Sequence, residues 1–367
     1  MDRIYLKNEE RALYALRMLY RSNGYLPFKM SKFEEYDLYV RNKDFLVSDS
    51  VITFNDTDGR LLALKPDVTL SIIKNTTYEQ GVKNRVYYDE NVYRVSGSTH
   101  RFKEILQTGL ECIGDIDVYD IFETVYLAAE SLYHISPDFV LDISHMGIYS
   151  GVLDKLSQDK MFRKEITSHI AGKNKHEAMA LCEKYGIEAE GAKHLVGFID
   201  LYGTPDAVMP ELLKIAEFSD TGAAYDELKT VVELLSKTEL YDRIRLDFSV
   251  VNNMKYYNGI VFRGFLEGIF EGVLSGGEYQ TLMARMGKGG SGVGFALYLD
   301  LLSELDRKEK EFDVDVLILY SDKTEMKAVI SKKNELIDNG CSVSVQRSIP
   351  KQLTYGRLID MDKEALK

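Results

Sequence analysis

A long helical stretch separates two strand-rich regions of the chain, and this order restricts the fold more than any other feature. From about residue 119 to 240 the apolar residues recur at helical spacing, whereas branched and aromatic residues typical of strands dominate 85–114 and return in IRLDFSV and YYNGIVFRGF. A doubly wound fold alternates single strands with single helices, and that order is absent here. The sequence therefore predicts an α+β fold in which a helical insertion interrupts one sheet.

The last part of the chain has a pattern of its own. After the charged link DRKEKEFD, the segments VDVLILY, TEMKAVISKKNELIDNG and CSVSVQ predict a strand, a helix and a strand. A chain of 367 residues is too long for one simple core. We therefore expect a main domain over residues 1–305 and a small α/β domain over 312–367.

Composition and charge argue against several classes of protein. The N-terminal MDRIYLKNEERALYALRMLY carries acidic residues where a signal peptide has a basic and then an apolar run. No apolar run reaches the length of about 18 residues that a membrane span needs, so we expect a cytoplasmic protein without membrane contact. A net charge of −12 argues against nonspecific binding of nucleic acid through a basic face.

Cysteines and histidines form no recognisable ligand pattern. The three cysteines are far apart and include no C-x-x-C pair, and the histidines lack metal-ligand spacing. We expect no disulfide framework, no metal and no cofactor.

Two strand-like segments, 85–94 and 102–114, are joined by the polar loop VSGSTHR and predict an antiparallel hairpin. In the second segment the period of two places Gln107, Gly109 and Glu111 on one face. Glycine weakens a strand unless something must approach the backbone closely, and a ligand is one such thing. A sheet face half open to water is the alternative, and for this short pattern alone it is favoured.

Asp67 is expected at the start of a helix. A short apolar strand runs into Lys65 and Pro66, and proline suits the first turn of a helix because its missing N–H would have no partner there.

A glycine-rich segment, GKGGSGVG, contains G-x-G-x-x-G. The preceding YQTLMARMG predicts a helix where a dinucleotide-binding fold needs a strand, so a flexible turn is favoured over a nucleotide site. Residues 291–302, SGVGFALYLDLL, then predict a further helix with Phe295, Leu299 and Leu302 on its buried face and Leu301 on the other.

The segments LKPDVT, VYR, LQTGLECIG, LDFSVVNNMKYYNGIVF, GGEYQTL and GVGFALYLDLL together resemble the catalytic core of histidyl-tRNA synthetase, a class II aminoacyl-tRNA synthetase. The resemblance extends over most of residues 1–305. It implies an antiparallel sheet flanked by helices, a homodimer built through the N-terminal part, and a helical insertion at about 145–240.

The resemblance also implies a site for free histidine. Carried over residue by residue, that site consists of Asp67, Thr69, Arg94, Gln107, Glu111, Tyr256 and Tyr257. The carboxylates of Asp67 and Glu111 suit an ammonium group and an imidazole N–H, while Arg94 suits a carboxylate.

The family's machinery for activating histidine is replaced in this sequence. R-G-L-D-Y-Y reads NNMKYY, which puts Asn252 in the place of the arginine and Lys255 in that of the aspartate. The family's G-L-E-R-L reads YLDLL here, so Leu301 replaces the arginine that binds the ATP phosphates. Lys65 replaces a further arginine of the family. Loss of one preorganised charge costs about 10²–10³ in rate, so we expect no useful adenylate formation.

A histidine site without these arginines resembles the regulatory subunit of ATP phosphoribosyltransferase, a paralogue of the synthetase. The resemblance implies a noncatalytic subunit that pairs with a short catalytic subunit in the first step of histidine biosynthesis, with L-histidine as feedback effector. A tail shorter than the roughly 100 residues of an ordinary domain, together with the acidic pI, argues against tRNA recognition.

Two alternatives stay open. A divergent histidyl-tRNA synthetase could use nearby lysines, although a lysine offers phosphate a point charge and not the planar fork of arginine. A paralogue with another partner or effector is the second. Exchange of pyrophosphate into ATP that depends on histidine separates the synthetase from the regulator.

Overall fold

The computed structural model describes residues 7–43, 46, 51–95, 101–251, 256–306 and 312–364. The chain divides into two compact units, of which one comprises Ala12–Leu302 and the other includes Ser303–Lys367. Among the described helices, none is long and apolar enough to cross a membrane.

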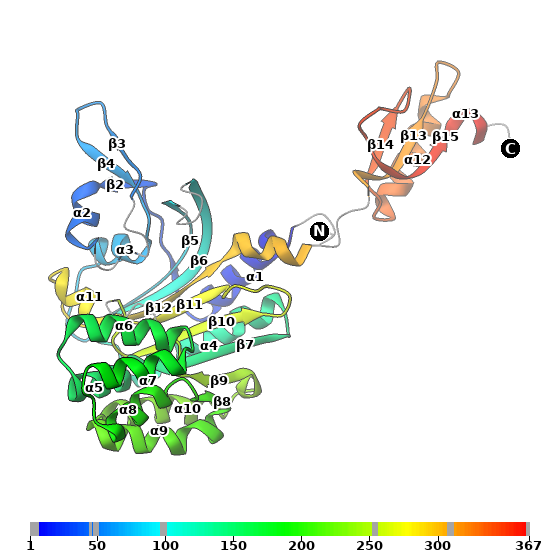
Figure 1. Ribbon diagram of the computed structural model, residues 1–367. Helices are drawn as coiled ribbons and strands as arrows, with labels where there is room; N and C mark the ends of the chain where they lie inside the picture. Colours follow the sequence, from blue (N-terminus) through cyan, green and yellow to red (C-terminus); the bar gives the residue numbers. More distant parts are fainter. Residues whose placement is uncertain are drawn as a thin grey trace. The chain divides into compact units, whose positions relative to one another are not determined.

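The larger unit is built on a mixed sheet of nine strands in the order β1-β5-β6-β12-β11-β10-β7-β9-β8 (Figure 1). Neighbouring strands are antiparallel except for the pairs β1–β5 and β7–β9. This arrangement confirms the α+β prediction. The strands are β1 (Leu26–Pro27), β5 (Lys83–Val95), β6 (Phe102–Gly114), β7 (Phe139–His145), β8 (Tyr202–Gly203), β9 (Ile244–Asp247), β10 (Ile260–Leu266), β11 (Leu274–Glu278) and β12 (Ser291–Tyr298).

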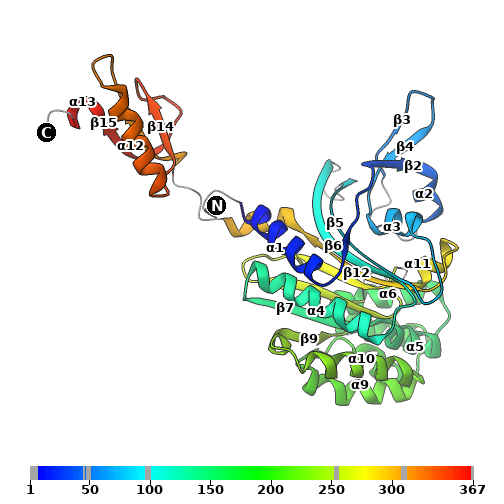
Figure 2. The same cartoon turned by 180° about the vertical axis from the view of Figure 1, so that it is seen from behind.

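Helices α1 (Asn8–Ser22) and α4 (Val118–Ile135) cover one face of the sheet (Figure 2). The two helices lie side by side and are joined by a hydrogen bond of 3.0 Å between the Tyr20 hydroxyl on α1 and the Ser131 hydroxyl on α4. The α4 side chains reach the sheet at Gly264, where a side chain would collide with Leu132. The opposite face of the sheet is therefore the one left for a binding site.

Parallel neighbours cannot be joined by a hairpin, and the helical insertion is the crossover that joins β7 to β9. It consists of α5 (Met146–Leu156), α6 (Lys160–Ala171), α7 (Lys175–Lys184), α8 (Ala189–Gly197), α9 (Pro205–Ser219) and α10 (Gly222–Leu235), together with strand β8. In Figure 1 these helices gather at the β9–β8 end of the sheet.

The predicted helix over residues 291–302 is wrong in its first part. Ser291–Tyr298 is strand β12, and a 3₁₀ helix, η4, follows at Leu299–Asp306. The apolar spacing misled because β12 lies between β6 and β11 and is buried on both faces, so the clean alternation of a half-exposed strand is lost. Phe295 packs against Tyr20 of α1 on one face, and Gly294 lies under the Glu111 carboxylate on the other.

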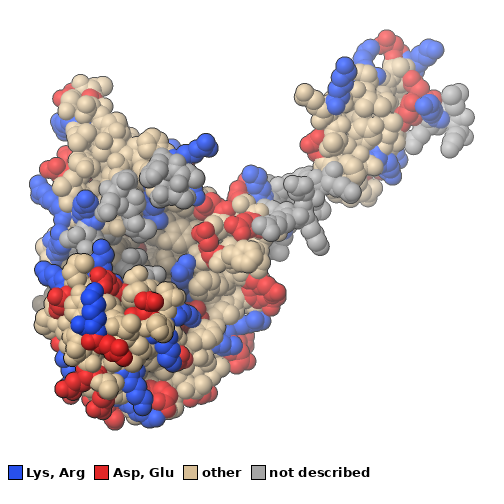
Figure 3. All heavy atoms as spheres, in the orientation of Figure 1, with Lys and Arg blue, Asp and Glu red and all other residues tan. Residues whose placement is uncertain are grey.

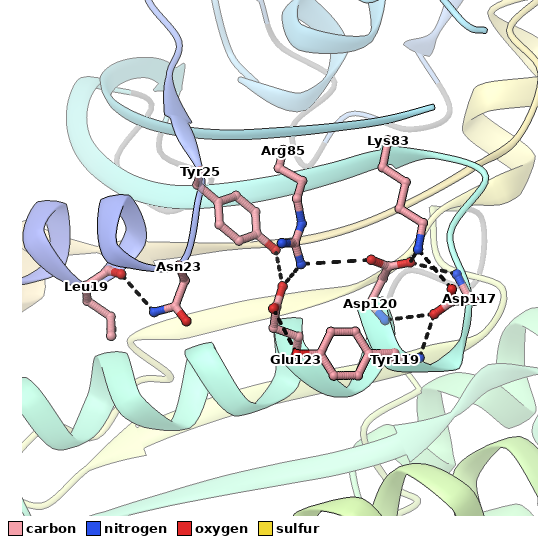
Figure 4. A network of polar contacts seen from close by, with 9 residues as sticks. All are labelled: Leu19, Asn23, Tyr25, Lys83, Arg85, Asp117, Tyr119, Asp120 and Glu123. Atoms are coloured by element: carbon pink, nitrogen blue, oxygen red, sulfur yellow. Dashed lines mark hydrogen bonds and ion pairs between the residues drawn. The ribbon is translucent and has the colours of Figure 1, made fainter. Parts of the chain in front are cut away.

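A network of charged groups ties the base of the β5–β6 hairpin to α4 (Figure 4). Arg85 of β5 pairs with Glu123 of α4, and the Tyr25 hydroxyl also donates to Glu123 over 3.4 Å. Lys83 of β5 pairs with the buried Asp120 of α4. These contacts fix the hairpin against the helix layer.

Smaller elements complete the main unit. A second, three-stranded sheet has the order β2-β4-β3. Its strands and the remaining helices are β2 (Phe33–Glu35), α2 (Tyr36–Arg41), β3 (Thr53–Asn55), β4 (Leu61–Leu64), α3 (Thr69–Asn75), α11 (Gln280–Arg285) and the 3₁₀ helix η3 (Tyr241–Arg243).

The C-terminal unit contains a parallel sheet in the order β14-β13-β15, with its own apolar core. Its elements are β13 (Val314–Leu319), α12 (Met326–Asp338), β14 (Val343–Gln346), β15 (Tyr355–Asp360) and α13 (Met361–Glu364). Val316 and Ile318 of β13 pack with Val329 and Leu336 of α12.

Candidate functional site

A cavity of about 730 Å³ lies on the face of the sheet opposite α4. Arg263 lines it, whereas the next residue on β10, Gly264, faces Leu132 of α4. Figure 3 shows this side of the molecule, where positive and negative side chains are interspersed on the surface.

The structure brings all the predicted histidine-binding residues together around this cavity. They come from the start of α3, the β5–β6 hairpin and the segment before β10, and they are Asp67, Thr69, Arg94, Gln107, Glu111, Tyr256 and Tyr257. Their roles in binding histidine stay a prediction.

Glu111 is the central acidic group. It is buried, and its two carboxylate oxygens accept hydrogen bonds of 2.6 Å from the hydroxyls of Thr69 and Tyr279. Burial raises the pKa of Glu111 to about 8, against the lowering effect of these two hydroxyls. The carboxyl therefore favours a ligand that supplies a positively charged or strongly polarised N–H group.

Glycines make room for the side chains at this end of the cavity. A Cβ at Gly294 on β12 would overlap the Glu111 carboxylate, and one at Gly109 on β6 would meet the Tyr88 hydroxyl and the Phe295 carbonyl. From the sequence, Gly109 fits either a sheet face half open to water or a ligand close to the backbone. In the structure the Tyr88 ring occupies that space, and its hydroxyl donates to the Phe295 carbonyl over 3.3 Å.

Asp67 lies just before α3, as predicted. One oxygen accepts the backbone N–H of Leu70 over 2.9 Å, which satisfies an otherwise unpaired group of the first helical turn. Burial raises the pKa of Asp67, while this hydrogen bond and the nearby Arg94 lower it. Asp67 and Glu111 thus place two buried carboxyl groups at one end of the cavity.

Arg94 and Gln107 add donors to the same end. Arg94 is held in place because its Nε donates to the Pro66 carbonyl over 3.0 Å. The side-chain amide nitrogen of Gln107 is buried and has no hydrogen-bond partner in the part of the chain that the structure describes. A buried donor without an acceptor is costly, so a ligand oxygen at this position would be stabilising.

Tyrosine rings form the wall beside these groups. The Tyr256 and Tyr257 ring centroids are 4.7 Å apart, and the Tyr279 ring is 6.0 Å from that of Tyr256. Sequence reasoning missed Tyr279 and Tyr88. Tyr279 is the second residue after the double glycine of GGEYQTL, and this motif was the available signal.

The two replaced activation residues differ in what the structure says of them. Asn252 lies outside the described residues. Leu301 lies in η4 and does not line the cavity. Lys65, also singled out, has a fully buried side chain whose ammonium is 2.5 Å from Glu90, so it too does not face the cavity.

The far end of the cavity carries charged residues that the sequence did not single out. They are Asp142 of β7, Asp247 of β9, Arg263 of β10 and Lys173, which follows α6. These residues are far apart in the sequence and come together only in the folded chain. No local sequence pattern predicts that they share a site.

A largely antiparallel sheet with helices on one face, a helical insertion and a polar cavity on the other face define a class II aminoacyl-tRNA synthetase-like protein. The family model described as histidyl-tRNA synthetase matches residues 5–302. The chain therefore belongs to the histidyl-tRNA synthetase family.

Individual proteins and solved structures are similar to this chain over most of its length. The ATP phosphoribosyltransferase regulatory subunit of Oceanobacillus iheyensis is 28% identical over 286 residues, which is 77% of this chain and 70% of that protein. An ATP phosphoribosyltransferase regulatory subunit/histidyl-tRNA synthetase from Bacillus halodurans has the same fold, with a TM-score of 0.77, 20% identity and coverage of 96% and 93% of the two chains. A chain of the ATP phosphoribosyl transferase (HisG:HisZ) complex from Thermotoga maritima also has it, with a TM-score of 0.61, 20% identity and coverage of 79% and 97%.

Proposed function

We propose that the chain is the noncatalytic regulatory subunit of an ATP phosphoribosyltransferase, which binds histidine and regulates a short catalytic subunit in the first step of histidine biosynthesis. The relative in Oceanobacillus iheyensis, which carries this name, supports the assignment. The fold shared with a chain of the HisG:HisZ complex supports a catalytic partner of that kind.

The observation that carries the proposal is the composition of one end of the cavity. Two buried carboxyl groups, Asp67 and Glu111, suit the ammonium and an imidazole N–H of histidine. Arg94 suits its carboxylate, and the Gln107 side-chain amide nitrogen, which no described residue contacts by a hydrogen bond, supplies a further donor. An analogue without the imidazole would leave buried polar groups unpaired, so the site would discriminate strongly.

The residues in the place of the synthetase's activating arginines support a noncatalytic role. Leu301 has no charge to offer a phosphate, and Lys65 is committed to Glu90 inside the protein. Neither side chain lines the cavity.

Regulation follows from linkage. If histidine binds one state of the complex better than another, it shifts the population toward that state by the difference in its affinities. The homodimer through the synthetase-like core and the cytoplasmic location belong to the same proposal.

Calorimetric titration with histidine tests the site. We expect saturable binding to the wild-type chain and a loss of about tenfold or more in Glu111→Gln, since a hydrogen bond to a charged group contributes about 1.5–3 kcal/mol. Glu278→Gln is the matched control: Glu278 is also a buried carboxyl, with its pKa raised to about 7 by burial, but it does not line the cavity. A wild-type chain that ignores histidine would remove the ligand assignment.

Two assays separate the regulator from a divergent synthetase. Copurification with a short phosphoribosyltransferase chain, and histidine sensitivity of the joint activity, are expected of the regulator. Histidine-dependent exchange of pyrophosphate into ATP by the chain alone would favour the synthetase.

A further inference from the structure

The far end of the cavity is separated from the proposed histidine site by three strands of the sheet. Asp142 lies on β7 and Glu111 on β6, and β12, β11 and β10 lie between them. Four strand spacings of about 4.8 Å place these carboxyl groups about 19 Å apart in the sheet, too far for one amino acid to touch both.

Asp142 is the first unusual group at this end. Its side chain is buried, with 6% of the residue exposed, and its Oδ1 has no hydrogen-bond partner among the described residues. Burial, and then the nearby Asp247, raise the pKa of Asp142 to about 7, against the lowering effect of Lys173, Arg245 and Arg263. A buried carboxylate oxygen without a donor is costly to keep, which points to a donor that the residues described by the structure do not supply.

Arg263 is directly opposite Asp142 in the antiparallel β7–β10 pair, so both side chains are on the cavity face. No ion pair or hydrogen bond joins Arg263 to another residue that the structure describes. Its guanidinium carbon is instead 5.2 Å from the centre of the Phe265 ring. The guanidinium fork is therefore available to an anion.

The other two charged residues that line this end, Lys173 and Asp247, form an ion pair with each other. The Lys173 ammonium is 3.3 Å from the Asp247 carboxylate, which also accepts two hydrogen bonds from Ser249. With this pair set aside, one carboxylate and one guanidinium remain, Asp142 and Arg263. Their complement is a molecule with one positive and one negative group.

The cavity has room for such a molecule beside the first ligand. Its volume of about 730 Å³ is in the range of roughly 300–1,000 Å³ that holds drug-sized ligands, well beyond the need of one amino acid. Apolar and aromatic side chains surround the charged groups, namely Val140, Ala171, Tyr202 and Phe265.

We propose that this end of the cavity is a second binding site, for a small zwitterion of the α-amino-acid type. Its ammonium group binds Asp142 and its carboxylate binds Arg263, while its side chain packs against Val140 and Phe265. A dianion such as a sugar phosphate fits less well, because it would bring negative charge to Asp142 and offer no cation. The site is independent of the identity of the ligand at Glu111.

The test titrates each standard amino acid separately into the full chain, alone and after saturation with histidine. We expect at least one to bind the histidine-saturated protein, or histidine itself to bind with two sites per chain. Asp142→Asn and Arg263→Gln should each weaken this binding about tenfold or more, since each removes a charge-assisted hydrogen bond. Analogues of the bound amino acid that lack the amino or the carboxylate group should weaken it to a similar extent.

Glu111→Gln is the control for the other end of the cavity and should leave this second binding unchanged. Asp142→Asn keeps the size of the side chain and removes a buried charge, so its thermal midpoint should not fall below that of the wild type. Absence of any amino-acid binding beyond one histidine per chain would overturn the proposal. Binding that is insensitive to Asp142→Asn and Arg263→Gln would also overturn it. Loss of histidine binding with the second site intact would instead contradict the proposed function alone.

Discussion

Glu111 and Gly294 depend on each other at the scale of single residues. Glu111 extends from β6 over its neighbour β12, and Gly294 is its direct partner in the strand pairing. Because Gly294 has no side chain, the carboxylate lies above its backbone and reaches both Thr69 and Tyr279. The glycine therefore shapes the site without contributing any chemistry to it.

Gly294→Ala should lower the free energy of unfolding by about 1–3 kcal/mol, the usual cost of overpacking, and should weaken histidine binding. The new methyl group would overlap the Glu111 carboxylate and the Leu110 carbonyl. Denaturant unfolding and histidine titration of the variant measure both effects. Gly197→Ala is the control, since nothing lies within 4 Å of a Cβ at Gly197, and it should change stability by less than about 1 kcal/mol. Equal effects of the two substitutions would contradict this account.

At the scale of elements, a helix or strand could be predicted from the sequence where turn residues, a proline or a regular apolar period marked it. The β5–β6 hairpin was predicted because a polar loop and period-two segments mark it, and Asp67 was placed correctly because proline marks the start of α3. Strand β12 was misread, since its residues are buried on both faces and the apolar ones also fit helical spacing.

The start of helix α4 is fixed by a capping box of neighbouring residues. Asp117 caps it by accepting the backbone N–H groups of Tyr119 and Asp120 over 2.9 and 3.3 Å, and Asp120 reciprocates by accepting the Asp117 N–H. Asp117→Ala should lower the free energy of unfolding by about 0.5–2 kcal/mol in denaturant titrations. Glu188→Ala is the control, because Glu188 precedes α8 without a side-chain capping bond, and it should have little effect. A larger loss from Glu188→Ala would argue against the capping explanation.

At the scale of the whole molecule, the cavity was only partly predictable. Its Glu111 end follows from short motifs and a family resemblance, which give each residue by position. Its Asp142 end has no such signal, because Asp142 and Arg263 become neighbours only when β7 pairs with β10 across more than a hundred residues of sequence. The sequence also gave no reason to expect a Tyr88 ring above Gly109.

The buried carboxyl groups predict how stability depends on pH. The pKa values of Glu111, Asp142 and Glu278 are raised to about 8, 7 and 7, mainly by burial, from ordinary values of 4.5, 3.8 and 4.5. Between the unfolded and folded pKa values the folded chain binds more protons, so its free energy of unfolding should fall as the pH rises from about 5.5 to 8. Each group contributes at most about 1.4 kcal/mol per pH unit.

Denaturant midpoints of the ligand-free protein across this range measure the effect. Glu111→Gln should flatten the dependence, because the amide does not titrate. Saturating histidine should flatten it as well, since its N–H groups favour the charged carboxylate. A midpoint that rises steadily over the same pH range would contradict the prediction.

The insertion leaves the sheet at β7 and returns at β9, and these two strands are immediate neighbours. The two points at which the insertion joins the sheet are thus one strand spacing apart, whatever the length of the insertion between them. A change in the length of the insertion therefore leaves the pairing of β7 with β9 geometrically possible. Asp142 and Asp247 lie on those two strands, and Lys173 and Tyr202 of the insertion line the cavity beside them, so the insertion borders the far end of the cavity directly.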